Sequence, residues 1–305
     1  LGGIADAARG GPLDLPGRPV GVVARGLLAE IEARVQGRLD ADPTLARRAT
    51  DLRRAAGLAE TELERHHAGR LLDSTGTAAD VQPNHRTGTA DATTPSDDPL
   101  DLAMGSFPYV HNYRLLVTAE LAGLARFRRP HHLTFCGAGA LPLTGILAHR
   151  QSGAAVRLIE IEPETADLAR AVLDALDRRH VVDAALLDVE TGDAGAVDLS
   201  DSDVIVVASL VPMATVSELV DRLRRLPVDR RPLLVVRSAS GLVGHFAYDP
   251  IDPSTIVAAG GYRHVGTVAP AGREPLTGPP LLGRADPSVL NTSEYFVPAG
   301  APHRR

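Results

Sequence analysis

Short apolar runs alternate with amphipathic segments along the second half of the chain. Apolar residues that recur at helical spacing predict helices near 141–150, 163–178 and 213–225. Between these segments, continuous apolar runs predict strands at 132–136, 156–160, 183–187, 203–208 and 233–237. Strand and helix repeating at this spacing indicate an α/β fold with a doubly wound parallel sheet. Such sheets bind ligands at the carboxyl ends of their strands, where the strand order reverses.

The first half of the chain has helical periodicity instead. Apolar residues at helical spacing predict a helix over 20–39. Asp42 and Pro43 then supply an N-cap and a first-position proline for a second helix, which runs to about Leu71 with Gly57 as a candidate break. These two helices precede the region of alternating strands and helices.

Three segments depart from both patterns. Residues 1–19 are rich in glycine, proline and alanine and predict a loose leader. Residues 73–99 are almost free of large apolar side chains, which predicts a mobile loop. The final third is rich in proline and glycine, although the run at 294–297 predicts an edge strand. We therefore divide the chain into an N-terminal helical domain at 1–126 and a sheet domain at 127–305.

Composition narrows the classes of function. The chain has 305 residues, enough for a full core, and a net charge of −6 with its 32 Lys and Arg residues dispersed, which argues against nucleic acid as a partner. No apolar run approaches the roughly 18 residues that cross a bilayer, so we expect no membrane span. The single cysteine, Cys136, excludes an internal disulfide and fits a reducing compartment. We expect a cytoplasmic protein with a small-molecule partner, and leave a homodimer open.

A glycine-containing loop, in the stretch CGAGALPLTG, follows the first predicted strand. Gly137 and Gly139 stand where a missing side chain allows a tight turn and close approach of a ligand. Pro142 suits the first position of the helix that follows. Because Pro142 also takes the place of the third glycine of a dinucleotide-binding loop, a nicotinamide dinucleotide is disfavoured.

Two acidic residues come next at positions that suit a nucleoside. Glu160 ends the second predicted strand, 21 residues after Gly139, where a carboxylate can accept hydrogen bonds from both ribose hydroxyls. Asp188 ends the third predicted strand, where a carboxylate can meet an adenine amino group. Each feature alone is also common at ordinary turns and strand ends. Together they describe a nucleoside site without a pyrophosphate, and S-adenosylmethionine fits that description.

Five further stretches in the chain form a recognisable set. They are AETELERHHA (59–68), FPYVHNY (107–113), FCGAGALPLTGILA (135–148), ASLVPM (208–213) and RSASGLVGHFAYDPIDP (237–253). The combination of FPYxxNY with GxGxLPLT is far more specific than a bare glycine loop. Together the stretches resemble motifs of the nicotianamine synthases and of their bacterial relatives that make opine-type metallophores such as staphylopine, and the likeness covers roughly residues 50–300.

The resemblance implies a sheet like that of class I methyltransferases, with a Rossmann-like fold, and an N-terminal helical domain that closes over the site. It also implies transfer of the 3-amino-3-carboxypropyl (aminobutyryl) group of S-adenosylmethionine to an amine, with release of methylthioadenosine. The family's LExH and NY motifs implicate a glutamate and a tyrosine at the reacting centre, and the matching residues are Glu64 and Tyr113. An amine nucleophile must lose a proton, which a nearby general base can accept.

The FPYVHNY stretch supplies two further candidates for cofactor binding. Tyr109 lies one helical turn before Tyr113, so it can meet the sulfonium by a cation–π contact or simply belong to the core. Asn112 can hold the carboxylate or amine of the aminobutyryl arm, or cap a helix at 113–125.

Other motifs add candidates around the predicted sheet. Arg237, at the end of the fifth predicted strand, can bind a carboxylate of the acceptor or form a salt bridge at the strand end. Leu141, in the LPLT stretch, and Ser209, through its backbone after the fourth strand, complete the expected cofactor site. His66 and His67 are adjacent and so lie on different faces of a helix, and we expect no metal in the protein.

The likeness is incomplete close to the expected pockets. Residues 73–99 lengthen the segment between LERHHA and FPYVHNY relative to the plant enzymes, SASG replaces SAHG, SLVPM replaces ALVGM, and Val110 replaces a tyrosine. The acceptor therefore stays open between a free amino acid and a second S-adenosylmethionine. Alternatives are a cyclase that makes azetidine-2-carboxylate, an ordinary methyltransferase, and a nicotianamine-binding or regulatory protein. The retained LExH and NY motifs favour the transferase.

Overall fold

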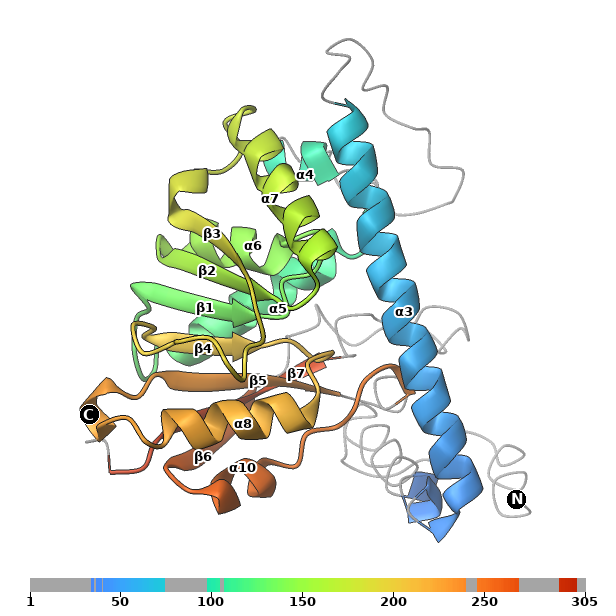
Figure 1. Cartoon of the computed structure of the whole chain (residues 1–305), viewed down its shortest axis with the longest axis vertical. Coiled ribbons are helices and arrows are strands. Elements are labelled where there is room, and N and C mark those ends of the chain that lie inside the picture. The colour runs from blue at the N-terminus through green and yellow to red at the C-terminus, as the bar shows by residue number, and fades with distance from the viewer. Residues whose placement is uncertain are drawn as a thin grey trace, which may run out of the picture.

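One seven-stranded sheet organises the fold (Figure 1). The computed structural model describes residues 34–35, 37–39, 41–74, 98–104, 107–239, 246–268 and 291–300. The strand order is β3-β2-β1-β4-β5-β7-β6, in which β7 runs antiparallel to both neighbours and the other pairs are parallel. This is the class I methyltransferase arrangement expected from the sequence. The strands are β1 (His132–Cys136), β2 (Ala155–Glu160), β3 (Leu187–Thr191), β4 (Val204–Val207), β5 (Leu233–Ala239), β6 (Tyr262–Val268) and β7 (Asn291–Pro298).

Helices cover both faces of the sheet. One buried cluster packs helices on one face, and a second cluster packs those on the other. The first face carries α5 (Val110–Leu124), α6 (Leu143–Ser152), α7 (Pro163–Asp177) and, at its margin, α4 (Pro99–Met104); the second carries α8 (Met213–Leu223) and α10 (Pro253–Ala259). Short 3₁₀ turns at Ala184–Leu186 and Val228–Arg230 precede β3 and β5. Strand order reverses between β1 and β4, so a ligand site is expected beside their carboxyl ends.

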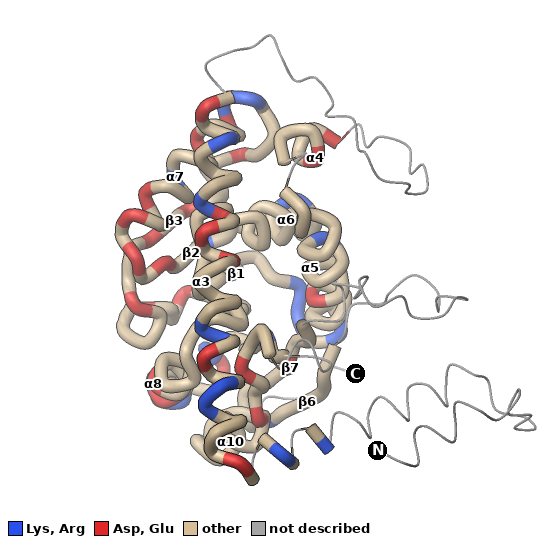
Figure 2. The backbone as a smooth tube through the Cα atoms, turned by 90° about the vertical axis from the view of Figure 1, so that its right-hand side faces the viewer, with Lys and Arg blue, Asp and Glu red and all other residues tan. Residues whose placement is uncertain are grey.

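Helix α3 (Pro43–Asp73) crosses the carboxyl ends of the strands (Figure 1). Its start is the expected one, since the Asp42 side chain accepts hydrogen bonds from the backbone N–H groups of Thr44 and Leu45. The helix continues through Gly57, so the break considered there is absent. Basic and acidic residues alternate along it (Figure 2), and its buried residues include Glu64, Ala68 and Leu71. One long helix thus spans the end of the sheet where ligands bind.

Two sequence predictions for strands are wrong, and one strand was not predicted. The run at 183–187 was expected to be a strand, but Ala184–Leu186 is a 3₁₀ turn capped by the Asp183 side chain, and β3 begins only at Leu187. The strand expected at 294–297 is not at an edge, because β7 lies between β5 and β6. The edge strand β6 was not predicted, since only part of it is buried and a register shift interrupts it.

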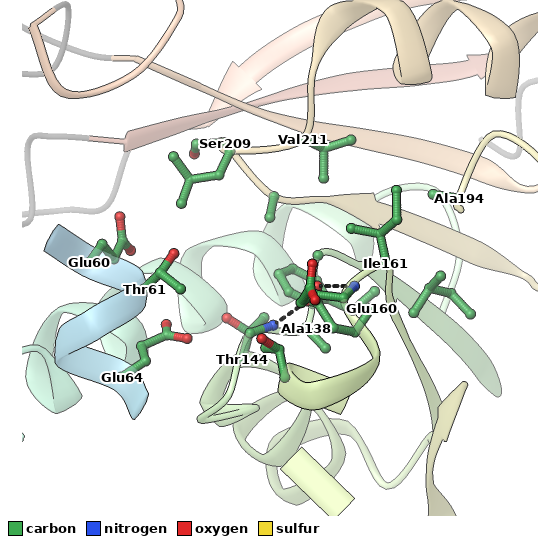
Figure 3. Close-up of a pocket in the computed structure, with 18 of the residues that line it drawn as sticks. Glu60, Thr61, Glu64, Ala138, Thr144, Glu160, Ile161, Ala194, Ser209 and Val211 are labelled. Carbon is green, nitrogen blue, oxygen red and sulfur yellow. Dashed lines mark hydrogen bonds between the residues drawn. The ribbon is translucent and has the colours of Figure 1, made fainter. Parts of the chain in front are cut away.

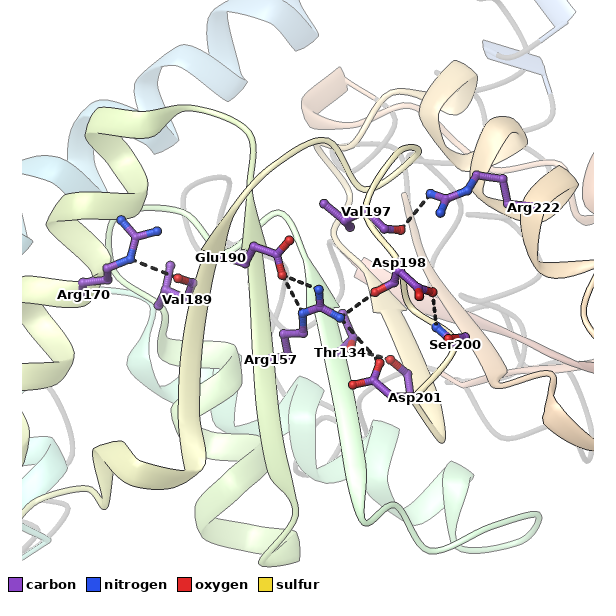
Figure 4. Close-up of polar contacts among 11 residues, drawn as sticks. Thr134, Arg157, Arg170, Val189, Glu190, Val197, Asp198, Ser200, Asp201 and Arg222 are labelled. Atoms are coloured by element: carbon purple, nitrogen blue, oxygen red, sulfur yellow. Dashed lines mark hydrogen bonds and ion pairs between the residues drawn. The ribbon is translucent and has the colours of Figure 1, made fainter.

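A polar network fixes the loop after β3 (Figure 4). Arg157 of β2 donates to the carboxylate of Glu190 on β3, to the carbonyl of Asp198 at 2.6 Å and to Asp201 at 3.5 Å. Arg222 of α8 donates to two carbonyls of the same loop, those of Gly195 and Val197, at 2.8 and 2.7 Å. Two arginines therefore hold the loop whose first residues reach the ligand site.

Several predictions concern segments outside the described residues. The predicted leader at 1–19 lies wholly outside the described residues. Most of the predicted helix at 20–39 and most of the predicted loop at 73–99 also lie outside them. The division into domains at 1–126 and 127–305 stays a proposal. One core cluster includes residues on both sides of that boundary, from α3, α4 and α5 to the sheet.

Candidate active site

A cavity of about 340 Å³ lies between α3 and the carboxyl ends of the strands. Its size falls within the usual range of small-molecule sites. Figure 3 shows Glu60 and Glu64 on α3 facing Glu160 across the cavity, with Ser209 and Val211 on a third side. Three separate segments therefore converge on one site, as expected where strand order reverses.

The glycine loop brings backbone rather than side chains to this cavity. Gly137 and Gly139 both line it, with φ values of +89° and +68° that only glycine adopts readily. A Cβ on Gly139 would overlap Oε2 of Glu64, so the missing side chain makes room for that carboxylate. Leu141 also lines the cavity. The predicted loop thus has a second purpose, which is to admit Glu64 of α3.

Glu160 lies where the sequence predicts it, at the carboxyl end of β2 and in the cavity. Its Oε2 accepts a hydrogen bond from the Gly139 N–H at 2.8 Å, and its Oε1 accepts one from the Glu162 N–H at 3.1 Å. These bonds fix the carboxylate and leave lone pairs on both oxygens. Glu160 can therefore accept further hydrogen bonds from a diol in the cavity.

Asp188 does not reach the cavity. Because β3 begins at Leu187, Asp188 is exposed near the start of this strand, at the opposite end of the sheet from the site. Asp193 follows β3 instead and lines the cavity, with Oδ1 accepting a hydrogen bond from the Gly195 N–H at 2.8 Å. The four-residue error in the predicted strand concealed Asp193, which is the acid at the strand end.

Two carboxyl groups and two tyrosines form the wall on the α3 side. The Tyr113 hydroxyl lies 3.3 Å from Oε1 of Glu64 and 3.3 Å from Oε1 of Glu60. The Tyr248 hydroxyl donates to Oε2 of Glu60 at 2.8 Å. Glu64 and Tyr113, both predicted, are thus in contact, whereas Glu60 and Tyr248 were not singled out. Their spacing of four places Glu60 and Glu64 on one helix face, a signal that the sequence contained.

Burial makes this wall unusual in its proton affinity. Burial raises the pKa of Glu64 to about 8, and the neighbouring charge of Glu60 raises it further. Hydrogen bonds from the backbone of Leu141 and Ala140 and from the Tyr113 side chain oppose this shift, because they lower the pKa of Glu64. Burial likewise raises the pKa of Glu60, and it raises the pKa of Tyr113 well above the ordinary value for a tyrosine. A glutamate with a pKa near neutrality is suited to exchange protons with a substrate.

The raised pKa of Glu64 predicts how stability varies with pH. The folded protein keeps the Glu64 proton up to about pH 8, whereas the unfolded chain releases it near the ordinary value of 4.5, so stability falls as pH rises between these values. Glu64→Gln removes this loss because glutamine has no proton to release. We expect the variant to melt several degrees above the wild type near pH 9 and at the same temperature below pH 4.5, in thermal unfolding scans. Equal melting temperatures at pH 9 would show that Glu64 ionises freely.

Arg237 is held by a buried ion pair. Its Nε and Nη2 donate to the two oxygens of Glu120 at 2.8 and 2.9 Å, its Nη1 donates to Thr144 at 3.1 Å, and its guanidinium lies over the Phe135 ring. The salt bridge considered from the sequence is therefore present. Ser293 also donates to Glu120, at 2.6 Å. Because Arg237 lines the cavity as well, its contact with a substrate carboxylate stays a prediction.

Removal of one partner of this ion pair should destabilise the fold. Glu120→Gln keeps the volume but leaves the Arg237 charge uncompensated, and we expect a loss of roughly 3–5 kcal/mol in the free energy of unfolding by urea. Asp221→Asn is the matched control, since the Arg224–Asp221 pair is about half exposed on both sides. That variant should change stability by less than about 0.5 kcal/mol. A similar small loss for Glu120→Gln would contradict the assignment.

Two predicted residues at the start of α5 lie away from the cavity, namely Tyr109, which directly precedes the helix, and Asn112 in its first turn. Tyr109 is 37% exposed and packs edge-on against Phe107, with ring centroids 5.8 Å apart, so it does not line the site. Asn112 is also absent from the lining, and it caps no helix, because α5 begins at Val110 rather than at residue 113. Only Tyr113 of the FPYVHNY stretch reaches the cavity, since neighbouring helical residues point in different directions.

The remaining candidates concern Ser209 and metal binding. Ser209 lines the cavity, and its hydroxyl donates to Oδ1 of Asn291 at 3.0 Å, while its backbone contact with a cofactor stays a prediction. The rings of His66 and His67 meet edge-on at 5.4 Å. In the described part of the chain, no group of three or more His, Cys, Asp or Glu side chains could hold a metal ion, and no helix could span a membrane.

Comparisons with known proteins place the chain in a family. Three structures of MtNAS are similar to the chain: a glutamate-to-glutamine mutant (26% identity, TM-score 0.62, 88% of this chain and 81% of that one), a complex with MTA and tNA (27%, 0.61, 86% and 79%) and the mutant with S-adenosylmethionine (27%, 0.60, 85% and 80%). No curated protein sequence matches the chain. The family model "Nicotianamine synthase protein" matches residues 76–274. Because that span is more than half of the chain, the protein belongs to the nicotianamine synthase family.

Proposed function

We propose that this chain transfers the 3-amino-3-carboxypropyl group of S-adenosylmethionine to an amine and releases methylthioadenosine. The observation that carries the proposal is the position of the Glu64 carboxyl and the Tyr113 hydroxyl in the same cavity as the glycine loop and Glu160. Family membership and the MtNAS complexes with S-adenosylmethionine and with MTA and tNA support it. The proposal includes a role in metallophore biosynthesis, with either a free amino acid or a second S-adenosylmethionine as the acceptor.

The sheet side of the cavity has the groups that an adenosyl moiety needs. Glu160 has lone pairs available for ribose hydroxyls, and Asp193 can accept a hydrogen bond from the adenine amino group. Ile159, Ile161 and Val211 give the same region apolar surface for a planar base. Gly137 lets the glycine loop pack closely against this region, because a Cβ there would lie 3.0 Å from the side chains of Ala208 and Val211. We assign this side to the nucleoside.

The α3 side of the cavity supplies proton transfer. S-adenosylmethionine contributes a γ-carbon activated by its sulfonium sulfur. The acceptor nitrogen bonds to that carbon while the carbon–sulfur bond breaks, and the bonding electron pair stays on sulfur. The nitrogen loses one proton, which Glu64 accepts in its ionised form; the positive charge of the bound sulfonium favours this form over the protonated form of the free protein. Alignment of the nitrogen with the γ-carbon rather than the methyl carbon selects the product, because displacement at carbon is in line.

Product analysis tests this proposal. The protein is incubated with S-adenosylmethionine, with and without a pool of amino acids, and the products are analysed by mass spectrometry. Adenosyl products are followed together with mass increases of about 101 Da on acceptors, the net gain of C4H7NO2 when the transferred C4H8NO2 group replaces one hydrogen. We expect methylthioadenosine whose formation increases with the correct acceptor. Methylthioadenosine with azetidine-2-carboxylate and no acceptor would identify a cyclase, and binding without turnover would identify a binding protein.

The cytoplasmic location and a homodimer stay predictions.

A further inference from the structure

Glu60 has no role in the proposed function, although it lies in the same wall as Glu64. Both side chains line the cavity from α3, four residues apart and hence on one helix face. The Tyr113 hydroxyl, from α5, lies between them at 3.3 Å from an oxygen of each carboxyl group. The three groups form a continuous chain of hydrogen-bonding distances.

The number of protons limits the hydrogen bonds that Glu60, Tyr113 and Glu64 can form with one another. A tyrosine hydroxyl has one proton, so it donates fully to only one of the two carboxyl groups. If both were ionised, two negative charges would face one hydroxyl in a buried site, which is costly. A proton on one carboxyl group removes the repulsion, because this group then donates to the tyrosine oxygen while the tyrosine donates to the other carboxylate.

The surrounding groups indicate which carboxyl holds the proton. Glu60 accepts a second tyrosine hydrogen bond, from Tyr248 in the segment after β5, and the positive charge of Arg237 on β5 acts to lower its pKa. Glu64 is more deeply buried, and its pKa is raised to about 8, in part by the charge of Glu60. The negative charge is therefore better stabilised on Glu60, and the proton on Glu64.

We propose that Glu60 is a positioning residue for Glu64: in the free protein the two carboxyl groups hold one proton between them through Tyr113, and the charge on Glu60 sets the pH at which Glu64 ionises. Its use in deprotonating the acceptor rests on the proposed function. Titration then removes the shared proton from Glu64 to solvent, which leaves Tyr113 between two carboxylates. The pair titrates as a coupled unit, so its apparent values belong to both residues.

Carbon-13 NMR of labelled glutamate side chains in the free protein tests this without turnover. We expect one carboxyl resonance, absent in Glu64→Gln, that titrates near pH 8 in the wild type and at least about one pH unit lower in Glu60→Gln. Glu62→Gln is the matched control, because the Glu62 side chain on the same helix is 72% exposed and should leave the midpoint unchanged. An unchanged midpoint in folded Glu60→Gln would overturn the proposal.

A second variant protects the test against misfolding of Glu60→Gln. Tyr113→Phe keeps the ring and removes the hydroxyl, so two carboxyl groups lose their bridge and the midpoint of Glu64 should move upward. A midpoint that stays in place there would also overturn the proposal. Kinetics separate it from the proposed function. If the NMR midpoints move as expected but no variant, wild type included, forms methylthioadenosine, the proposed function fails alone.

Discussion

Glu64→Gln is expected to reduce turnover by about 10²- to 10⁴-fold, the usual contribution of a general base. Glutamine keeps the size of the side chain and its contact with Tyr113 but cannot accept the proton of the acceptor amine. Binding of S-adenosylmethionine should be retained, because with a pKa of about 8 the native carboxyl group is largely protonated at pH 7 in the free protein. Single-turnover rates and calorimetric titration measure the two effects separately.

Glu62→Gln provides the control for this experiment. Glu62 lies on the same helix, two residues away, with an exposed side chain 3.5 Å from Arg65. Its replacement should leave both rate and affinity unchanged. A Glu64→Gln variant that keeps the wild-type rate would remove Glu64 from the role of base, whereas joint loss of rate and cofactor affinity would mean that it mainly shapes the pocket.

Gly139→Ala should remove activity at least as completely. A Cβ at this position would overlap Oε2 of Glu64, and φ of +68° strains any residue with a side chain. The Glu64 carboxylate would have to move away from the glycine loop. We therefore expect at least a 10³-fold loss of turnover and weaker binding of S-adenosylmethionine. Because a 1 Å misplacement of a reacting group can cost about 10²-fold, small displacements suffice for a large effect.

Gly153→Ala separates backbone strain from overlap. Gly153, at the carboxyl end of α6, has a similar φ of +74°, but nothing lies within 4 Å of an added Cβ. This control should lose about 1 kcal/mol of stability and no activity. In a Glu64→Ala background, Gly139→Ala should cost no more stability than Gly153→Ala does, since its steric partner is gone. A full additional loss in that background would show that the overlap with Glu64 is not the cause.

The sequence predicted the architecture well where strands are buried on both faces. β4 and β5 contain continuous apolar runs and β1 and β2 are largely apolar, and each of the four was placed within about two residues. β3 and β6 are the sheet edges and have no such run. In β3, buried Leu187 and Val189 alternate with the more exposed Asp188 and Glu190, so the longer apolar run before it attracted the prediction. The resulting error assigned the acid at the strand end to Asp188, whereas the acid that follows β3 and lines the cavity is Asp193.

The sequence predicted those cavity residues that belong to recognisable motifs. It missed residues whose place in the cavity depends only on contacts between distant segments. Glu64 and Tyr113 come from motifs, and both line the cavity. Glu60 resembles a solvated helix residue until the sheet covers it, and Tyr248 reaches Glu60 across 188 positions in the chain. Burial of this kind depends on tertiary packing, which local sequence pattern does not encode. The spacing between Glu60 and Glu64 was the one local signal for the pair.

The most direct test of the account follows a single carbon. The protein is given S-adenosylmethionine labelled with carbon-13 in its methyl group, together with the amino acid pool, and the products are separated and weighed. If the aminobutyryl arm is transferred, the label stays with the adenosyl product, as methylthioadenosine heavier by one mass unit, and the modified acceptor is unlabelled. Label in the acceptor, accompanied by unlabelled S-adenosylhomocysteine, would contradict the account and identify a methyltransferase.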